Sequence, residues 1–237
     1  MELSRAYVLH SRPWRETSLL VDWFTEDWGR VTTCQRGIRR SHKGAAGRPT
    51  PFSPLQIGLS GRGGMPVACP IEPASPAAGL AGCWLRGQAL AVGFYLNELL
   101  LRAVQPQEPL PRLFAAYEEA LLALCIRQEP FEVLLRRFER RLLDELGVGF
   151  DWQQTVDTGL AVHPEQTYRV HPEWGIAAET AQGMPVAGRV LCALAANQPQ
   201  QHADDRRAAQ ALLQMLLAPL IGAAPFHSRR LWRSSAE

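Results

Sequence analysis

Between Trp28 and Ile71 the chain carries basic residues and no acidic ones. The seven cations in this stretch are Arg30, Arg36, Arg39, Arg40, Lys43, Arg48 and Arg62. The whole chain has a net charge of only +2, so the remainder carries 2 − 7 = −5. A local positive field on a nearly neutral protein is typical of a surface that binds a polyanion. Arginine suits phosphate because its planar guanidinium donates two parallel hydrogen bonds and stays charged.

The densest part of this stretch, residues 36–48, is also rich in glycine. It predicts a cationic loop between two strands, where glycines allow the backbone to approach phosphates. The alternative is a solvated surface loop in an arginine-rich protein, because basic runs alone are weak evidence. No helix presents the Arg, Asn and Gln pattern that reads base edges, so the sequence predicts binding without base specificity.

Four aromatic residues near the basic stretch are candidate platforms on which bases could stack: Trp14, Trp23, Phe24 and Trp28. Leu19, Val21 and Trp23 alternate with Leu20, Asp22 and Phe24, as in a strand that packs on both faces. This alternation favours core packing for Trp23 and Phe24. Trp14 and Trp28 lie in predicted turns, and for them stacking and packing remain equally open.

The elements that must position these residues change character near residue 80. Before it, short segments with a period of two are separated by turn residues. The strand-like segments are residues 6–10, 18–24, 30–34 and 55–59. About five strands with frequent turns predict a small barrel rather than alternating strands and helices. The predicted domains are therefore 1–79 and 80–237, with the boundary in a Pro/Ala/Gly stretch at 70–82.

After residue 80 the apolar spacing becomes helical, over 85–102, 113–127 and 130–146. The third helix has an apolar stripe from Phe131 to Leu146, with Pro130 in its first turn and Gly147 at its end. Arg136, Arg137 and Arg140 lie on its other face, where Glu132 could pair with Arg136. A last helix is expected over 204–217, stopped by Pro219. The fold class is α+β, a five-stranded barrel followed by an all-α C-terminal domain.

Several classes of protein do not fit this sequence. The longest apolar run, 89–101, is too short to span a bilayer, and the first residues lack the pattern of a signal peptide. Five scattered cysteines form no CxxC pair, which predicts reduced thiols in a cytoplasmic protein. Nucleotide-binding loops and hydrolase motifs such as GxxxxGK, HExxH and GxSxG do not occur. We therefore expect neither an enzyme, nor a cofactor, nor a small-molecule substrate.

Several motifs occur in an order that resembles the RecO family of bacterial recombination mediators. They are residues 7–20, Phe24-Thr-Glu with Gly29-Arg30, 36–39, 51–55, 94–100, 135–139, Leu146-Gly147 and 225–229. The resemblance runs from residue 7 to about 232. It implies an N-terminal OB-fold and a helical C-terminal domain, in agreement with the change of period. OB-fold barrels bind single strands in a cationic groove with aromatic platforms.

The resemblance also implies a function in DNA repair and homologous recombination. It implies binding of single- and double-stranded DNA, annealing of complementary strands, and loading of recombinase with RecR onto DNA coated by single-strand-binding protein (SSB). The expected place of action is the nucleoid, and no membrane is involved. The DNA-contacting residues would be Arg15 and the seven cations of the basic stretch. An RNA-binding OB protein of translation is the alternative, but it does not explain the matches in the helical half.

A second site follows from the same resemblance. In the family, the motif at Leu135-Arg-Arg-Phe-Glu139 contributes to a pocket for the acidic C-terminal tail of SSB, which ends in an aromatic residue and a carboxylate. If this role applies to the matching motif here, Arg136 is expected to bind the terminal carboxylate of the tail, and Arg137 is the second expected contact. A groove between helices would take the aromatic ring. The alternative is a solvated helix face with a Glu132–Arg136 pair.

One departure from the family concerns metal. Many relatives have a four-cysteine zinc ribbon after the Leu-Gly that ends the third helix, but residues 150–175 contain no cysteine. His163 and His171 cannot form a structural zinc site alone, and each precedes a proline. We expect no metal, and an irregular segment at about 150–187, a hairpin or loop, in place of the ribbon.

Overall fold

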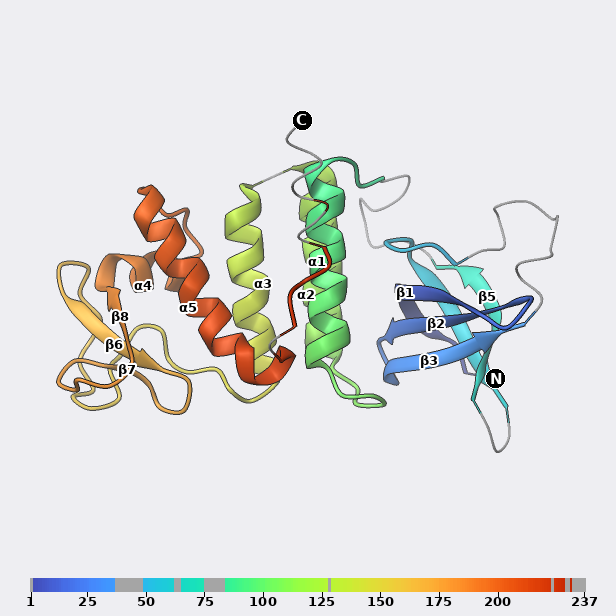
Figure 1. The fold of residues 1–237 in the computed structure, drawn as a ribbon, viewed down its shortest axis with the longest axis horizontal. Coiled ribbons are helices and arrows are strands. Elements are labelled where there is room, and N and C mark those ends of the chain that lie inside the picture. The colour runs from blue at the N-terminus through green and yellow to red at the C-terminus, as the bar shows by residue number, and fades with distance from the viewer. Residues whose placement is uncertain are drawn as a thin grey trace. The chain divides into compact units, whose positions relative to one another are not determined.

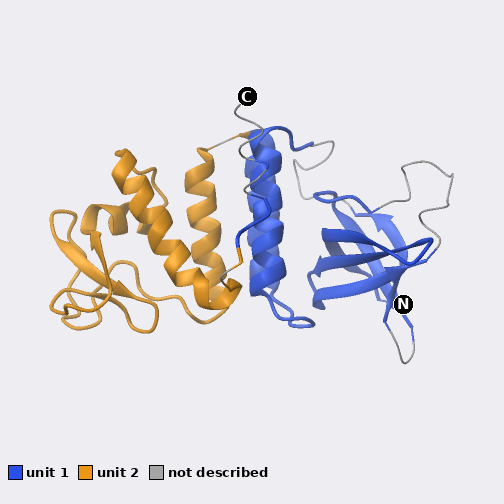
Figure 2. Cartoon of the chain, viewed as in Figure 1, with its two compact units in different colours: residues 1–126, 225–237 blue, residues 127–224 orange. Residues whose placement is uncertain are grey.

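The computed structural model describes residues 2–36, 49–61, 65–74, 84–127, 129–222, 224–228 and 231. The chain forms two compact units, residues 1–126 with 225–237 and residues 127–224 (Figures 1 and 2). The predicted boundary at residues 79 and 80 falls outside the described residues. None of the described helices has the length and apolar character that a membrane span requires.

Unit 1 is built on a five-stranded antiparallel sheet in the order β3-β2-β1-β4-β5. The strands are β1 (Ser4–Trp14), β2 (Ser18–Thr25), β3 (Gly29–Gln35), β4 (Leu55–Ser60) and β5 (Val67–Pro73). The two edge strands approach each other where the Cys34 amide donates to the Pro66 carbonyl at 2.9 Å. The sheet thus curls into an OB-like barrel, and the predicted five-stranded fold is confirmed.

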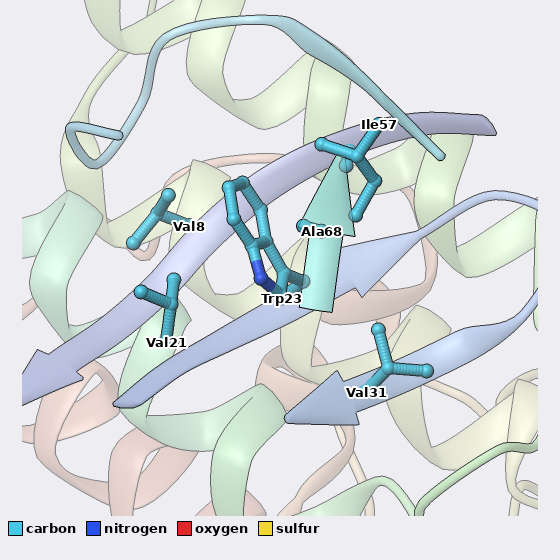
Figure 3. Packing of buried hydrophobic residues seen from close by; sticks show 7 residues of the cluster. Val8, Val21, Trp23, Val31, Ile57 and Ala68 are labelled. Atoms are coloured by element: carbon cyan, nitrogen blue, oxygen red, sulfur yellow. The ribbon is translucent and has the colours of Figure 1, made fainter. Parts of the chain in front are cut away.

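The alternating pattern of β2 places its side chains on two different faces. Trp23 fills the barrel with Val8, Val21 and other small apolar side chains (Figure 3). Its indole nitrogen donates to Thr33 Oγ1 at 2.8 Å, so the buried polar tip is satisfied. Phe24 faces outward and packs against Phe114, with ring centroids 5.5 Å apart. Both Trp23 and Phe24 are completely buried, which confirms core packing over base stacking for this pair.

Two helices, α1 (Gln88–Ala103) and α2 (Pro111–Ile126), complete unit 1 and cover the outside of β1 and β2. Asn97 on α1 donates to the carbonyls of Val8 and Leu9, at 3.2 and 3.0 Å. Leu9 is the extra residue of a β-bulge, because the register of β1 with β2 shifts between Val8 and His10. Asn97 thereby supplies a hydrogen-bond donor to two buried backbone carbonyls at the bulge.

The end of the described chain returns to α1. The Glu98 carboxylate accepts hydrogen bonds from the amides of His227 and Ser228 at 3.0 and 2.9 Å, and from the Ser228 hydroxyl at 2.9 Å. Phe226 packs against Tyr95 with the rings tilted and their centroids 4.9 Å apart, and the Arg102 guanidinium lies 4.5 Å from the Phe226 ring centroid. Residues 225–228, which we call the C-terminal clasp, are therefore fixed to α1.

Unit 2 contains three helices, α3 (Phe131–Glu145), α4 (Gly188–Ala195) and α5 (Ala203–Ile221). The apolar stripe of α3 is buried at Leu134, Leu135, Phe138 and Leu142, as predicted. Gly147 follows the last helical turn with a φ of 73°, the left-handed conformation that favours glycine at a helix end. The helical C-terminal half is thus confirmed.

Three expectations for this half of the chain were wrong. The segment at 150–187 contains a three-stranded sheet in the order β7-β6-β8, so the C-terminal half is not all-α. Its strands β6 (Thr167–His171), β7 (Gly175–Ala177) and β8 (Met184–Ala187) are short and gave little periodic signal. Helix α5 continues through Pro219, because a proline so near the end removes only one hydrogen bond and Gly222 still donates to Ala218. Cys125 is disulfide-bonded, so not every described cysteine is a thiol.

Candidate nucleic-acid interface

One end of the barrel carries a groove lined by both aromatic and cationic residues. The β1–β2 turn contributes Trp14 and Arg15, the end of β3 contributes Arg36, and the β4–β5 connection contributes Gly61 and Met65. Antiparallel pairing brings these segments together, because Trp14 is opposite Ser18 and Gln35 is opposite Leu19.

The side chains of this groove, which we call the Trp14 groove, are accessible to a ligand. Trp14 is 44% exposed and Met65 51%, and Arg15 and Arg36 are also exposed. Arg15 has a φ of 53°, a left-handed conformation that is unusual for a residue with a side chain and that fixes the tight turn. The groove also contains Glu16, whose negative charge moderates its field.

The outer face of the sheet beside this groove holds a polar cluster that the sequence did not reveal. Asp22 is buried and accepts a hydrogen bond from Thr32 Oγ1 at 2.6 Å. Arg12 donates to the same carboxylate at 3.3 Å, and His10 Nδ1 lies 3.7 Å from it. Arg12 is therefore a further cation near the groove. Only the register of β1 with β2 and of β2 with β3 could have identified the cluster, because the partners of Asp22 are ten or twelve residues away from it in the sequence.

The structure brings together only some of the predicted DNA-contacting residues. Arg15 and Arg36 line the Trp14 groove. Arg30 lies six residues from Arg36 along β3, about 20 Å away at ~3.3 Å per residue. Its Nε donates to the Val104 carbonyl at 2.9 Å. The other predicted cations lie outside the described residues: Arg39, Arg40, Lys43, Arg48 and Arg62.

The arginines of α3 are engaged in ion pairs. Arg136 Nη1 lies 2.7 Å from Glu139 Oε2. The two groups form an ion pair, but their orientation does not meet the geometry of a hydrogen bond. Arg137 pairs with Glu129. The expected Glu132–Arg136 pair is wrong for the described side chains, because Glu132 lies 3.7 Å from Arg206 on α5 instead. Arg136 pairs instead with Glu139, three residues further along the helix. Glu139 is completely buried, so its carboxylate needs a neighbouring cation.

Arg136 and Arg206 also line a small cavity between α3 and α5. Its apolar lining includes Val133, Leu194 and Ala209. The cavity therefore combines two guanidinium groups with an apolar wall, whereas Arg137 is absent from the lining. The sequence did not connect Arg206 with Arg136, because their proximity depends on the packing of α5 against α3.

The segment that occupies the position of the zinc ribbon is held by hydrogen bonds. Asp157 accepts from the amides of Ala178 and Glu179 at 2.9 and 2.8 Å. These bonds, that of Glu179 first, lower the pKa of Asp157 below its ordinary value. His171 stacks on Trp174 with centroids 4.9 Å apart. Among the described residues, no group of three or more His, Cys, Asp or Glu side chains is arranged to hold a metal ion. The residues present do not fit a zinc ribbon.

Comparison with known proteins agrees with this architecture. Residues 1–68 match the family described as Recombination protein O N terminal, and residues 85–230 match Recombination protein O C terminal. A DNA repair protein RecO from Marinobacter nauticus is 38% identical over 235 residues, which cover 97% of this chain and 93% of the relative. DNA repair proteins RecO from Photobacterium profundum and an Enterobacter species are 37% and 38% identical, each covering 97% of this chain and 95% of the relative. With both of its parts matched in order, the chain belongs to the RecO family of DNA repair and recombination proteins.

Proposed function

We propose that this protein is a recombination mediator that acts on the nucleoid in the cytoplasm. It binds single- and double-stranded DNA, anneals complementary strands, and works with RecR to load recombinase onto SSB-coated DNA. It does so as a binding protein without enzymatic chemistry. Family membership supports the role in DNA repair and recombination.

The observation that carries the DNA-binding proposal is the composition of the Trp14 groove. An exposed indole offers a surface on which any base can stack, and the guanidinium groups of Arg15 and Arg36 are suited to phosphates on either side. In the sequence, Arg36 is followed directly by the basic segment 37–48, whose cations lie outside the described residues. These contacts recognise the backbone and the faces of bases, which suits a protein that must anneal any sequence.

We further propose that the cavity beside Arg136 receives the C-terminal tail of SSB. The supporting observation is the combination of cations with an apolar wall, because an acidic peptide with a terminal aromatic residue needs both. Arg136 is partly neutralised by Glu139, and Arg206 is the more exposed of the two cations. Arg206 therefore joins Arg136 as a proposed partner of the tail. Arg137 donates to Glu129 and does not line the cavity, so it has weaker support as a partner of the tail.

The test is annealing of complementary fluorescent oligonucleotides, either naked or coated with SSB. We expect the protein to accelerate annealing of both, and to lose its effect on coated strands when the SSB lacks its tail. If coated strands anneal equally well without the tail, the proposed SSB contact is wrong. If naked strands anneal no faster than without protein, the proposed annealing function is wrong.

Two further arms test the remaining parts of the proposal. Adding RecR should increase recombinase filament formation on SSB-coated DNA above the level reached with this protein alone. Single-stranded RNA of the same sequence should compete no better than DNA for the barrel. A clear preference for RNA would instead support an RNA-binding protein of translation, an alternative that membership of a DNA repair family does not favour.

A further inference from the structure

A second groove lies at the other end of β3, where the β2–β3 turn meets the connection between α1 and α2. It is lined by Trp28 and Arg30 from the barrel, by Pro106 and Gln107 from the helix connection, and by Met65. We call it the Trp28 groove. Trp28 is partly buried against the barrel core and partly exposed to the groove. The groove therefore repeats the pairing of an indole with a guanidinium that characterises the Trp14 groove.

The wall of the Trp28 groove is fixed to the barrel. The Gln107 amide donates to the Arg30 carbonyl at 2.9 Å. Gly29 lies directly against the backbone of Glu108, because a Cβ at this glycine would be only 2.0 Å from the Glu108 carbonyl oxygen. Two prolines, Pro106 and Pro109, restrict the same connection. A ligand entering this groove would meet walls that need no rearrangement.

Arg30 is oriented before any ligand binds. Its Nε donates to the Val104 carbonyl, which fixes the plane of the guanidinium. Within the part of the chain that the structure describes, its two terminal nitrogens make no hydrogen bond or ion pair. An arginine held through one nitrogen loses less conformational freedom when the others bind an anion. This favours phosphate as the ligand.

The two grooves share one lining residue. Met65 lines both of them, and β3 connects Arg30 to Arg36 over about 20 Å. At ~3.4 Å per stacked nucleotide this distance corresponds to about six nucleotides, within the site sizes of 4–16 nucleotides for one OB fold. Asp27 also lines the Trp28 groove, and its carboxylate disfavours a second phosphate there.

We propose that a single strand held in the Trp14 groove continues past Met65 into the Trp28 groove. There one phosphate binds the preoriented Arg30 and one base stacks on Trp28. The inference rests on the proposed DNA binding by the barrel and extends it, since it assigns the path of the strand beyond the Trp14 groove and a second aromatic platform. Arg30 thus contacts DNA at the far end of the path rather than beside Arg36.

The experiment is fluorescence anisotropy of a labelled twenty-nucleotide oligothymidine over a range of salt concentrations. We expect Arg30→Gln to weaken binding about tenfold, as for one charge-assisted hydrogen bond, and to reduce the log–log salt slope by about 0.7. Arg30→Lys, which keeps the charge and lacks the planar fork, should retain the slope and recover part of the affinity. Trp28→Leu should weaken binding without changing the slope, because stacking releases no counterions. Arg141→Gln, an exposed arginine of unit 2, is the matched control and should bind as the unmodified chain does.

A crosslinking measurement on the unmodified chain removes any dependence on how the variants fold. An oligothymidine with photoreactive iodouracil at successive positions should crosslink to Trp14 and, from positions about six nucleotides away, to Trp28 or Met65. Crosslinks at the Trp14 groove without any at Trp28 or Met65 would overturn the extended path while leaving DNA binding by the barrel intact. If Arg36→Gln and Arg30→Gln both bind normally, the barrel is not the DNA site and the proposed function itself fails.

Discussion

Arginines occur in two different settings in this chain, some beside carboxylates within the fold and some along the lining of a groove. Arg5 donates to Glu26 and Glu118, at 2.7–2.8 Å, and thereby connects β1 to the β2–β3 turn and to α2. Its hydrogen bond to Glu26 is the main cause that lowers the pKa of that carboxyl group. Arg15 and Arg36 line an open groove instead. A count of basic residues in the sequence cannot separate these roles, because the partners of Arg5 lie 21 and 113 residues away.

The Arg136–Glu139 pair leads to the first prediction. Glu139 is completely buried, so Arg136→Met should leave a buried carboxylate without its cation and lower the free energy of unfolding by about 3 kcal/mol. The double variant Arg136→Met/Glu139→Met should recover most of this loss, because an apolar pair of similar size removes the uncompensated charge. Arg112→Met, an exposed arginine on α2, should change stability by less than about 0.5 kcal/mol. Urea denaturation of the three variants measures the differences, and a double variant as unstable as the single one would contradict the explanation.

At the scale of elements, α1 connects segments that are far apart in the sequence. Phe94 packs against Phe52, at the end of the connection from β3 to β4, with ring centroids 5.1 Å apart. Asn97 binds the bulge of β1, and Glu98 binds the C-terminal clasp. Two of the motifs that carry the family resemblance thus contact each other directly, through Glu98 in one and His227 and Ser228 in the other. Their physical role is to fix the barrel and the end of the described chain to one helix.

The clasp gives the second prediction, a dependence on pH. Burial alone would raise the pKa of Glu98, but the hydrogen bonds from the amides of Ser228 and His227 and the nearby Arg102 hold it below the ordinary value. A carboxyl group whose pKa is lower in the folded state stabilises that state above its unfolded pKa of about 4.3. This stabilisation is lost as the pH falls through the lowered folded pKa. The protection factors of the His227 and Ser228 amides, which compare their hydrogen exchange with that of an unfolded chain at the same pH, should therefore be high at neutral pH and fall under acid conditions.

Glu98→Gln is the variant that tests this assignment. Glutamine keeps one acceptor oxygen but carries no charge, so the protection factors of these two amides should be lower at neutral pH and nearly independent of acidification. Glu119→Gln, on α2, should leave both amides as they are. If the protection factors at residues 227 and 228 still fall with acid in Glu98→Gln, another group controls the clasp.

The small sheet of unit 2 leads to the third prediction. Because the described residues contain no arrangement suited to zinc, purified protein should contain far less than one zinc per chain, and a chelator should leave its melting temperature unchanged. Asp157→Ala should lower the melting temperature, since it removes the acceptor that joins the 155–159 turn to Ala178 and Glu179. Elemental analysis that finds one zinc per chain would show that this view of the segment is wrong.

How far the sequence predicted this structure depends on the range of each interaction. The barrel strands, the α3 stripe and the end of α3 at Gly147 were predictable, because each depends on residues within a few positions of one another. The sheet of β6, β7 and β8 was not, since its strands are three to five residues long and are held by turns such as that at Asp157. The candidate site divides in the same way. Trp14, Arg15 and Arg36 could be proposed from their residue types. Register and packing decide the rest: the Arg12–Asp22 pair, the place of Met65 in both grooves, and the proximity of Arg206 to Arg136.

The whole molecule combines two proposed binding sites in separate units, one for DNA on the barrel and one for the SSB tail beside α3. If these sites act independently, variants should separate the two activities. Replacing Arg39, Arg40 and Lys43 with alanine should weaken DNA binding for all sequences alike and flatten the salt slope by about 0.7 to 1 per lost phosphate contact. Annealing of naked strands should slow, while binding of an SSB-tail peptide stays unchanged. An unchanged salt slope would exclude this basic segment as a phosphate site.

The complementary prediction concerns unit 2. Arg136→Lys keeps a cation beside Glu139, so it should fold normally, but it lacks the planar fork that a peptide carboxylate prefers. We expect it to bind the SSB-tail peptide about tenfold more weakly, and Arg206→Gln to do the same. Both variants should anneal naked strands at the normal rate and SSB-coated strands more slowly. Circular dichroism and urea denaturation must first show that they are folded. If naked-strand annealing falls equally, unit 2 belongs to the DNA path, because loss of a contact with SSB alone cannot slow a reaction from which SSB is absent.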